Sequence, residues 1–308
     1  MIATLTLNPA IDKSTSVAQL VPEKKLRCTD MIVEAGGGGI NISKAIAILN
    51  EKSKAVFTCG GINGKLLLEL LHKDSLETIP VQIEADTRES IVVTETSTNK
   101  EYKFIVPGPT LDEKALSEIK SAINNLKDVS FLVCSGSLPP GVPDHFLAGI
   151  AAIAKQKRIK FIVDTSGPPL KNSVTQGVYL IKPNMSELNF LAGTKYLEAN
   201  EIEEAANRII SSGHCEVIVV SMGPSGAMLV TKSLRKRFPA PLVKKQSTVG
   251  AGDSMLAGIV WMLEQNKSLE DAVRFGIACG TAATVNKGPQ LFKKEDAFRF
   301  YEWMKQVS

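Results

Sequence analysis

Short runs of consecutive apolar residues alternate along the chain with longer segments in which apolar residues recur every three or four positions. The short runs are rich in β-branched residues, which is typical of buried strands. They predict strands at Ile2–Leu7, Ala55–Thr58, Phe131–Cys134, Lys160–Val163, Tyr179–Ile181, Val217–Ser221 and Ala227–Val230. The longer segments predict helices at Asn41–Leu49, Asp112–Leu126, His145–Gln156, Ile202–Ser211, Ser254–Gln265, Ser268–Ala283 and Lys294–Lys305. This alternation predicts an α/β fold with a mostly parallel sheet covered by helices on both faces.

Two polar stretches, Ile11–Glu34 and Glu84–Pro107, interrupt this pattern. Both alternate polar and apolar residues with no helix between them. In the second stretch, Ser90–Thr96 and Lys100–Val106 flank a short polar turn, which is typical of a hairpin. We expect an antiparallel ribbon that forms a small lid on the α/β body. Because no repeat or linker is recognisable, residues 1–308 are predicted to form one domain with a discontinuous lid at about 11–34 and 84–107.

The composition excludes several classes of protein. With 44% hydrophobic and 22% charged residues, the chain of 308 residues has enough apolar surface to fold. No apolar run approaches the ~20 residues of a membrane helix, and the N-terminus lacks the pattern of a secretory signal. The net charge is only +4, and its densest basic cluster, Lys232–Arg237, is interpreted as a solvated loop. We expect no nucleic-acid or membrane partner. Five scattered cysteines predict reduced thiols and a cytoplasmic location.

Glycine placement is the most informative feature of the sequence. Gly36–Gly39 opens a helix that we expect to begin near Asn41, and glycines there allow backbone amides to approach a ligand closely. A flexible turn is the alternative. A second set of small residues, Gly250, Ala251 and Gly252, precedes an apolar helix. Consecutive amides at a helix start bind anions such as a transferring phosphoryl group.

Asp253 follows this second set, in the first turn of the expected helix. The helix start favours its ionised form, so it is placed to accept a proton. An ordinary N-terminal cap is the alternative. Other chemistries have little support: neither glycine set forms a Walker A loop or G-x-G-x-x-G, the histidines lack metal-ligand spacing, and CSGSLPPG is not a G-x-S-x-G elbow.

Two segments, GGGGINISKAIAIL and STVGAGDSMLAGIV, resemble the paired signatures of the PfkB carbohydrate kinases in the ribokinase-like superfamily. LNPAID, CSGSLPPG, VDTSG, KPNMSEL and VVSMGPSGA occur between or beside them in the family's order, so the resemblance covers essentially the whole chain. It implies a ribokinase-like three-layer α/β/α fold with a β lid over a sugar site, and phosphoryl transfer from Mg-ATP. The chain departs from the family at Asn50, where Gly or Ser is usual, but Asn also tolerates the left-handed conformation.

The resemblance implies a role for each matching residue. Asp253 would be the general base, beside an anion hole formed by Gly250, Ala251 and Gly252. The residues that would bind the sugar are Asp12, Gly37, Gly38, Gly39 and Asn41. Those that would bind ATP are Lys182, Asn184, Glu187, Ser221, Gly223, Gly226, Thr248, Gly250, Gly252 and Asn286.

The resemblance also implies metal ions at two places. Asn184 and Glu187 form the N-x-x-E element that helps to position Mg²⁺, largely indirectly. The alternative for Glu187 is an ordinary acidic residue in the first turn of a helix. The alternative for Asn286 is an ordinary helix cap. A potassium ion beside the anion hole would be held by Ser247, Val249, Ala283, Asn286, Gly288 and Gln290.

Details of the resemblance narrow the choice of sugar substrate. Family kinases of fructose 1-phosphate and tagatose 6-phosphate share the T-L-N-P-A-I-D element but usually carry Lys where this chain has Gly38. The GGGG run, PEKKLRC and QSTVGAGDSM resemble the family's 6-phosphofructokinases. We therefore expect phosphorylation of fructose 6-phosphate at the 1-hydroxyl, a step of glycolysis. Tagatose-6-phosphate kinase and 1-phosphofructokinase are alternatives. A kinase of an unphosphorylated sugar or nucleoside, and a non-catalytic sugar-binding relative, are more distant ones.

A sugar phosphate needs cationic partners near the lid. Candidates are Arg88, Arg27 and Lys25, with Ser137 as a neutral donor. Arginine suits phosphate because its planar fork donates two parallel hydrogen bonds. A solvated surface cation is the alternative for each of the three. The lid ribbons would expose sheet edges and apolar faces if left alone, so we expect a homodimer formed through the lid, as in similar kinases.

Overall fold

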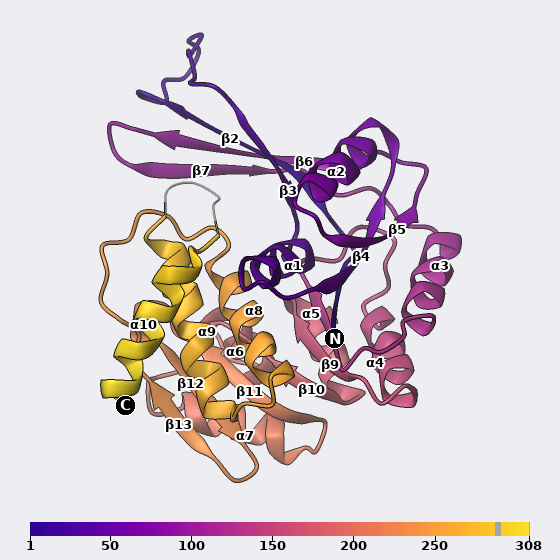
Figure 1. Ribbon diagram of the computed structural model, residues 1–308, viewed down its shortest axis with the longest axis vertical. Helices are drawn as coiled ribbons and strands as arrows, with labels where there is room; N and C mark the ends of the chain where they lie inside the picture. Colours follow the sequence, from indigo (N-terminus) through magenta and orange to yellow (C-terminus); the bar gives the residue numbers. More distant parts are fainter. Residues whose placement is uncertain (287–290, 308) are drawn as a thin grey trace.

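A large mixed sheet forms the centre of the protein, whose computed structural model describes residues 1–286 and 291–307 (Figure 1). Its strand order is β13-β12-β11-β10-β9-β8-β1-β4-β5, and all neighbouring pairs are parallel except β11–β12 and β12–β13. The strands are β1 (Ile2–Thr6), β4 (Ser53–Cys59), β5 (Glu77–Gln82), β8 (Phe131–Ser135), β9 (Lys160–Asp164), β10 (Val178–Ile181), β11 (Cys215–Ser221), β12 (Ala227–Thr231) and β13 (Arg235–Phe238). The predicted mostly parallel sheet is confirmed.

Helices cover both faces of this sheet because successive strand residues point to opposite sides. In β8, for example, Leu132 belongs to one buried cluster and Val133 to the other. The first face packs against α3 (Glu113–Asn124), α4 (Phe146–Gln156), α5 (Gly167–Thr175), α6 (Met185–Ala192) and α7 (Ile202–Ser211). The second packs against α1 (Gly38–Ile48), α8 (Ala251–Glu264), α9 (Leu269–Thr284) and α10 (Lys294–Val307). The result is the expected three-layer α/β/α body.

A separate four-stranded sheet forms the lid, which stands out from the body (Figure 1). Its order is β3-β2-β6-β7, built from β2 (Ala10–Val17), β3 (Ile32–Gly36), β6 (Arg88–Glu95) and β7 (Lys100–Ile105). A smaller buried cluster joins it to α2 (Gly61–Lys73) and β4. The predicted hairpin is confirmed by the antiparallel pairing of β6 with β7.

The central pair of the lid corrects one expectation. We predicted an antiparallel ribbon, but β2 and β6 pair in parallel from Ala10–Arg88 to Val17–Glu95. The physical reason is that both strands leave the body at the same place, one after β1 and the other after β5, so they run in the same direction. The division of the chain into one domain with a discontinuous lid stays a prediction.

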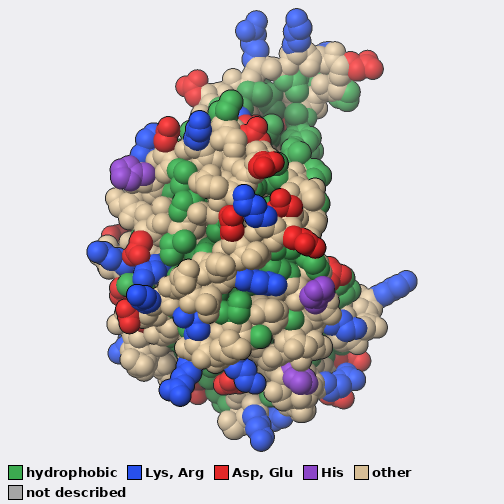
Figure 2. Space-filling view, turned by 90° about the vertical axis from the view of Figure 1, so that its right-hand side faces the viewer, with side chains coloured by type: hydrophobic (Ala, Val, Ile, Leu, Met, Phe, Trp, Pro, Cys, Tyr) green, Lys and Arg blue, Asp and Glu red, His purple; other side chains and the backbone are tan. Residues whose placement is uncertain are grey.

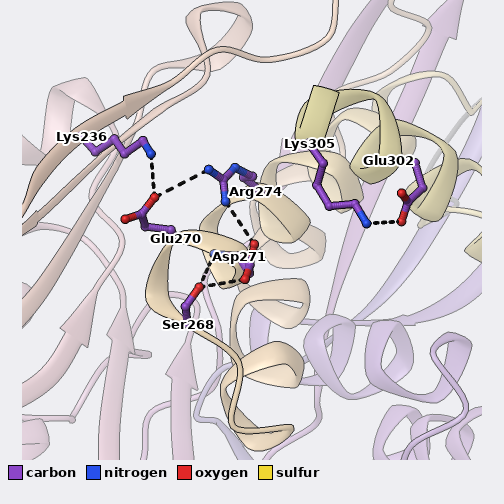
Figure 3. Close-up of polar contacts among 7 residues, drawn as sticks. All are labelled: Lys236, Ser268, Glu270, Asp271, Arg274, Glu302 and Lys305. Atoms are coloured by element: carbon purple, nitrogen blue, oxygen red, sulfur yellow. Dashed lines mark hydrogen bonds and ion pairs between the residues drawn. The ribbon is translucent and has the colours of Figure 1, made fainter. Parts of the chain in front are cut away.

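A network of charged side chains anchors the start of α9 to the edge strand β13 (Figure 3). Arg274 donates to Asp271 at 3.0 Å, lies 3.6 Å from Glu270, and stacks over the ring of Phe238. Glu270 also accepts a 2.6 Å hydrogen bond from Lys236 of β13. The basic cluster Lys232–Arg237 was interpreted as a solvated loop. This is wrong for its second half, because Arg235–Arg237 belong to β13. The strand is polar because it forms an edge of the sheet.

Arg274→Ala is expected to lower the free energy of unfolding by about 2 kcal/mol, because it removes the ion pairs to Glu270 and Asp271 together with the packing on Phe238. Urea unfolding measures this change. Arg208 offers a matched control, since it pairs with Glu204 at the same helical spacing but with side chains that are 66% and 71% exposed. Arg208→Ala should cost less than about 0.5 kcal/mol. Equal losses in the two variants would contradict a stabilising role for the network.

Candidate active site

Asp253 lies where the two glycine-rich helix starts meet. Its Oδ2 accepts a 2.8 Å hydrogen bond from Asn41 Nδ2 on α1, and its Oδ1 accepts one of 3.4 Å from Ser135 Oγ at the end of β8. Burial raises the pKa of Asp253 to about 6, with the nearby Asp164 charge adding to the rise against the hydrogen bonds and Lys182. A carboxylate with this pKa is suited to accept a proton near neutral pH.

The glycine run before α1 is needed for close packing as well as for ligand approach. A Cβ on Gly38 would lie 2.3 Å from Ser135 Oγ, and one on Gly39 would lie 2.5 Å from Thr6 Oγ1. Gly37 has a φ of 117°, a conformation that L side chains rarely adopt. These glycines allow α1 to dock directly on the ends of β1 and β8. This docking brings Asn41 to Asp253.

A buried lysine accompanies the small residues at the start of α8. Lys182 Nζ lies 3.2 Å from Asp164, and a Cβ on Gly252 would lie 3.6 Å from the same nitrogen. Burial lowers the pKa of Lys182, but the charges of Asp164, Asp253 and Glu187 outweigh it and leave the pKa raised. A permanent positive charge therefore lies beside the backbone amides of the predicted anion hole, where a phosphoryl group would be held.

The N-x-x-E element forms a capping box at the start of α6. Asn184 Oδ1 accepts a 2.9 Å hydrogen bond from the Glu187 amide, and Glu187 Oε2 accepts one of 2.9 Å from the Asn184 amide. This local role accounts for the motif, and its role at Mg²⁺ stays a prediction. Within residues 1–286 and 291–307, no group of three or more His, Cys, Asp or Glu side chains is arranged to hold a metal ion.

A pocket of about 580 Å³ adjoins the start of α8, between α9 and the loop that follows β13. The predicted ATP residues that line it are Asn184, Ser221, Gly223, Gly226, Thr248 and Gly252. Sequence analysis missed much of the remaining wall, which includes Pro241, Leu242, Val243 and Lys245 of the loop and Ile277, Gly280, Thr281 and Thr284 of α9. Asn286 lies elsewhere: it donates to the Leu291 carbonyl and lines a second pocket beside Lys44.

Of the predicted potassium ligands, Ser247 and Val249 belong to the loop before α8, which contacts the end of α9 where Ala283 lies. Ser247 Oγ accepts a 3.2 Å hydrogen bond from the Val249 amide, and the Ser247 amide donates to the Thr284 carbonyl at 3.3 Å. The Ala283 carbonyl accepts from the Asn286 amide at the end of α9. Gly288 and Gln290 lie outside the described residues.

The predicted sugar residues meet below the lid. Asp12 of β2 is half-buried, and this burial raises its pKa while the nearby charges of Arg88 and Lys44 lower it. The Arg88 guanidinium donates to the Asn8 carbonyl at 3.2 and 3.3 Å. The side-chain amide of Asn8 donates to Ser137 Oγ at 3.1 Å. Asp12, Arg88 and Ser137 are thus brought into one region.

Lys25 and Arg27 do not lie near Asp12, Arg88 and Ser137 in the folded chain. Both are exposed in the long loop that connects β2 to β3. This loop follows Val17, at the end of the lid farthest from the body (Figure 1). The structure therefore separates these two cations from Asp12.

Sequence analysis missed Ser135, Asp164 and the role of Asn8. Ser135 and Asp164 are the last residues of β8 and β9, and the two strands pair in parallel at these positions. The signal was available, because polar residues at the carboxyl ends of buried parallel strands commonly meet at a ligand site.

The model of the pfkB family carbohydrate kinases matches residues 5–296, and the chain belongs to this family. It is therefore a phosphotransferase with an alcohol group as acceptor. Among its relatives, the ATP-dependent 6-phosphofructokinase isozyme 2 of Escherichia coli (strain K12) is 38% identical over 304 residues, with 98% of each chain covered. A 1-phosphofructokinase of Borreliella burgdorferi is 32% identical, with 92% of each covered.

Solved structures show the same fold. Three structures of phosphofructokinase-2 from Escherichia coli, in complex with potassium, in complex with fructose-6-phosphate and in a tetrameric inhibited form, match with TM-scores of 0.95, 0.94 and 0.93. Their identities are 38%, 37% and 37%, and each match covers 99% of both chains. No helix in the described part of the chain is long and apolar enough to cross a membrane.

Proposed function

We propose that the protein transfers the γ-phosphoryl group of ATP to the 1-hydroxyl of fructose 6-phosphate, giving fructose 1,6-bisphosphate and ADP. The observation that carries this proposal is the position of Asp253, between the sugar-side Asn41 and the anion-hole residues beside Lys182. The names of the relatives and the fructose-6-phosphate complex of the Escherichia coli enzyme support the choice of sugar.

Asp253 acts as the general base in this proposal. Its carboxylate, oriented by Asn41 and Ser135, accepts the proton of the acceptor hydroxyl as that oxygen attacks the γ-phosphorus. The bond to the bridging oxygen breaks, and ADP leaves. The amides at the start of α8 and the Lys182 ammonium stabilise the charge on the transferring group.

Two kinds of cation fit the residues present. Asp164, Glu187 and Asn184 lie around Lys182 and would hold Mg²⁺, largely through water or phosphate oxygens. Mg²⁺ supplies charge neutralisation on the ATP phosphates. The carbonyl groups at Ser247, Val249 and Ala283 are hard oxygen donors of the kind that K⁺ prefers, and the potassium complex of the Escherichia coli enzyme supports this site.

Steady-state kinetics on fructose 6-phosphate, tagatose 6-phosphate, fructose 1-phosphate, fructose and adenosine test the substrate. We expect the highest kcat/KM for fructose 6-phosphate. A higher kcat/KM for fructose 1-phosphate would identify the protein as a 1-phosphofructokinase. A higher kcat/KM for tagatose 6-phosphate would identify it as a tagatose-6-phosphate kinase. A higher value for an unphosphorylated acceptor would contradict a role for the phosphate end of the substrate.

Arg88→Met in the same assay tests how the sugar phosphate is held. We expect the KM for fructose 6-phosphate to rise about 30-fold with the KM for ATP unchanged, because a charge-assisted pair to phosphate is lost. The kcat/KM for free fructose should change less than threefold. Lys13→Met is the control, because Lys13 is another lid cation but is paired with Glu89 at 2.8 Å.

A homodimer formed through the lid is part of the proposal. Large apolar side chains are exposed on β3, β7 and their ends, and Figure 2 shows hydrophobic side chains along the lid with cations near its tip. These side chains are Met31, Ile32, Tyr102, Phe104, Ile105 and Val106. A second lid would cover them. We propose a cytoplasmic location because all five cysteines are free thiols, four of them buried.

A further inference from the structure

A hydrogen bond joins the lid to the body next to the predicted anion hole. Glu101 of β7 accepts a 3.0 Å hydrogen bond from the hydroxyl of Ser247, a residue 146 positions away in the sequence. β7 is the edge strand of the lid that lies nearest the loop before α8 (Figure 1). Ser247 is 3% exposed and the Glu101 side chain is 19% exposed. The contact is therefore partly shielded from solvent at the point where the lid meets the loop.

Ser247 connects this lid contact to the start of α8. Its hydroxyl proton is directed to Glu101, which leaves the oxygen free to accept the Val249 amide at 3.2 Å. Val249 precedes Gly250, the N-cap of α8, which is held in the left-handed conformation with a φ of 69°. The amides that follow Gly250 are those of the predicted anion hole.

The same loop is fixed on its other side by α9. The amides of Gln246 and Ser247 both donate to the carbonyl of Thr284, at 2.8 and 3.3 Å. The backbone at Ser247 is thus held by α9, whereas the orientation of its hydroxyl depends on the lid. A hydrogen bond to an ionised acceptor is stronger than one between neutral groups, so Glu101 can set that orientation.

We propose that Glu101 is a positioning residue through which the lid fixes the loop that carries the anion hole. The proposal rests on the proposed kinase function of this site. Its consequence is that the phosphoryl-binding amides at α8 reach their working geometry when the lid lies over the sugar. Phosphoryl transfer is then linked to an occupied and closed sugar site, which limits transfer to water.

A double-mutant cycle, with kcat as the readout, tests whether the contact between Glu101 and Ser247 positions the anion hole. Glu101→Ala is expected to lower kcat about tenfold, with the KM for ATP and the thermal midpoint unchanged. Glu101→Gln should restore kcat to within threefold of the unchanged protein, because its amide oxygen still accepts the hydroxyl. Ser247→Ala should lose about as much as Glu101→Ala. The double variant should lose no more than either single variant, since both remove the same contact.

The control and the choice of substrate keep the test decisive. Lys100→Ala, at an exposed position of the same strand, should stay within twofold of the unchanged protein. The cycle is run with whichever acceptor proves best in the substrate screen, so a wrong sugar does not affect the outcome. The proposal is overturned if Glu101→Ala keeps kcat within twofold. It is also overturned if the two single losses multiply to about 100-fold in the double variant.

Discussion

Asp253→Asn is expected to lower kcat by at least ~100-fold while the KM for ATP stays within about threefold. The amide keeps the hydrogen bond from Asn41 but cannot accept the proton of the sugar hydroxyl. In the unchanged protein, kcat/KM should rise with pH through about 6, because only the ionised form of Asp253 acts as a base and burial places its pKa there. This acidic limb should be absent from the residual activity of the variant.

Thermal unfolding separates this loss from misfolding. Burial raises the pKa of Asp253, so its ionised form lowers the stability of the folded state at neutral pH. Removing the charge should leave the thermal midpoint no lower than that of the unchanged protein. Near-normal turnover in Asp253→Asn would remove this residue as the base.

Lys182→Met is also expected to lower kcat by at least ~100-fold. The reason is that the Lys182 charge, which lies beside Gly252, stabilises the transferring phosphoryl group. The pH profile should change as well. The Lys182 charge lowers the pKa of Asp253, so its loss should move the acidic limb of kcat/KM to higher pH. A pH series of initial rates measures both effects.

Two further lysine variants make this result interpretable. Lys182→Met leaves Asp164 without its ion-pair partner and lowers stability, so Lys182→Arg, which keeps the charge, is measured beside it. The arginine variant should keep the acidic limb where it is. Lys160→Met, at the exposed start of the neighbouring strand β9, should change neither turnover nor pH profile. An unmoved limb together with normal turnover in Lys182→Met would exclude Lys182 from the site.

Hydrophobic patterning predicted the buried strands well because each is a continuous apolar run between two helical layers. It failed at the sheet edges, where burial no longer dictates composition. β5 contains Pro80, and β13 is largely basic; both are edge strands, the positions where such residues are tolerated. The parallel pairing of β2 with β6 could not be predicted, because it depends on how the intervening chain folds back.

The site was predictable where residues form compact motifs, and not where they meet through the fold. Asp253 and the small residues before it stand together in the sequence, so the sequence identified them. Asn41 lies 212 positions from Asp253, and only the docking of α1 shows that it donates to this carboxylate. Asp164 lies in the VDTSG segment, but only the fold shows that it pairs with Lys182 and that its charge raises the pKa of Asp253.

The parallel pairing inside the lid also bears on how the chain folds. Ala10 and Arg88 pair across a long stretch of chain that contains β3, α1, β4, α2 and β5. Contacts between residues so distant in sequence carry a large loop-closure entropy and form slowly. We infer that the lid is completed late in folding, after this half of the central sheet. During refolding, helical structure should therefore return before the lid strands, and kinase activity should return last.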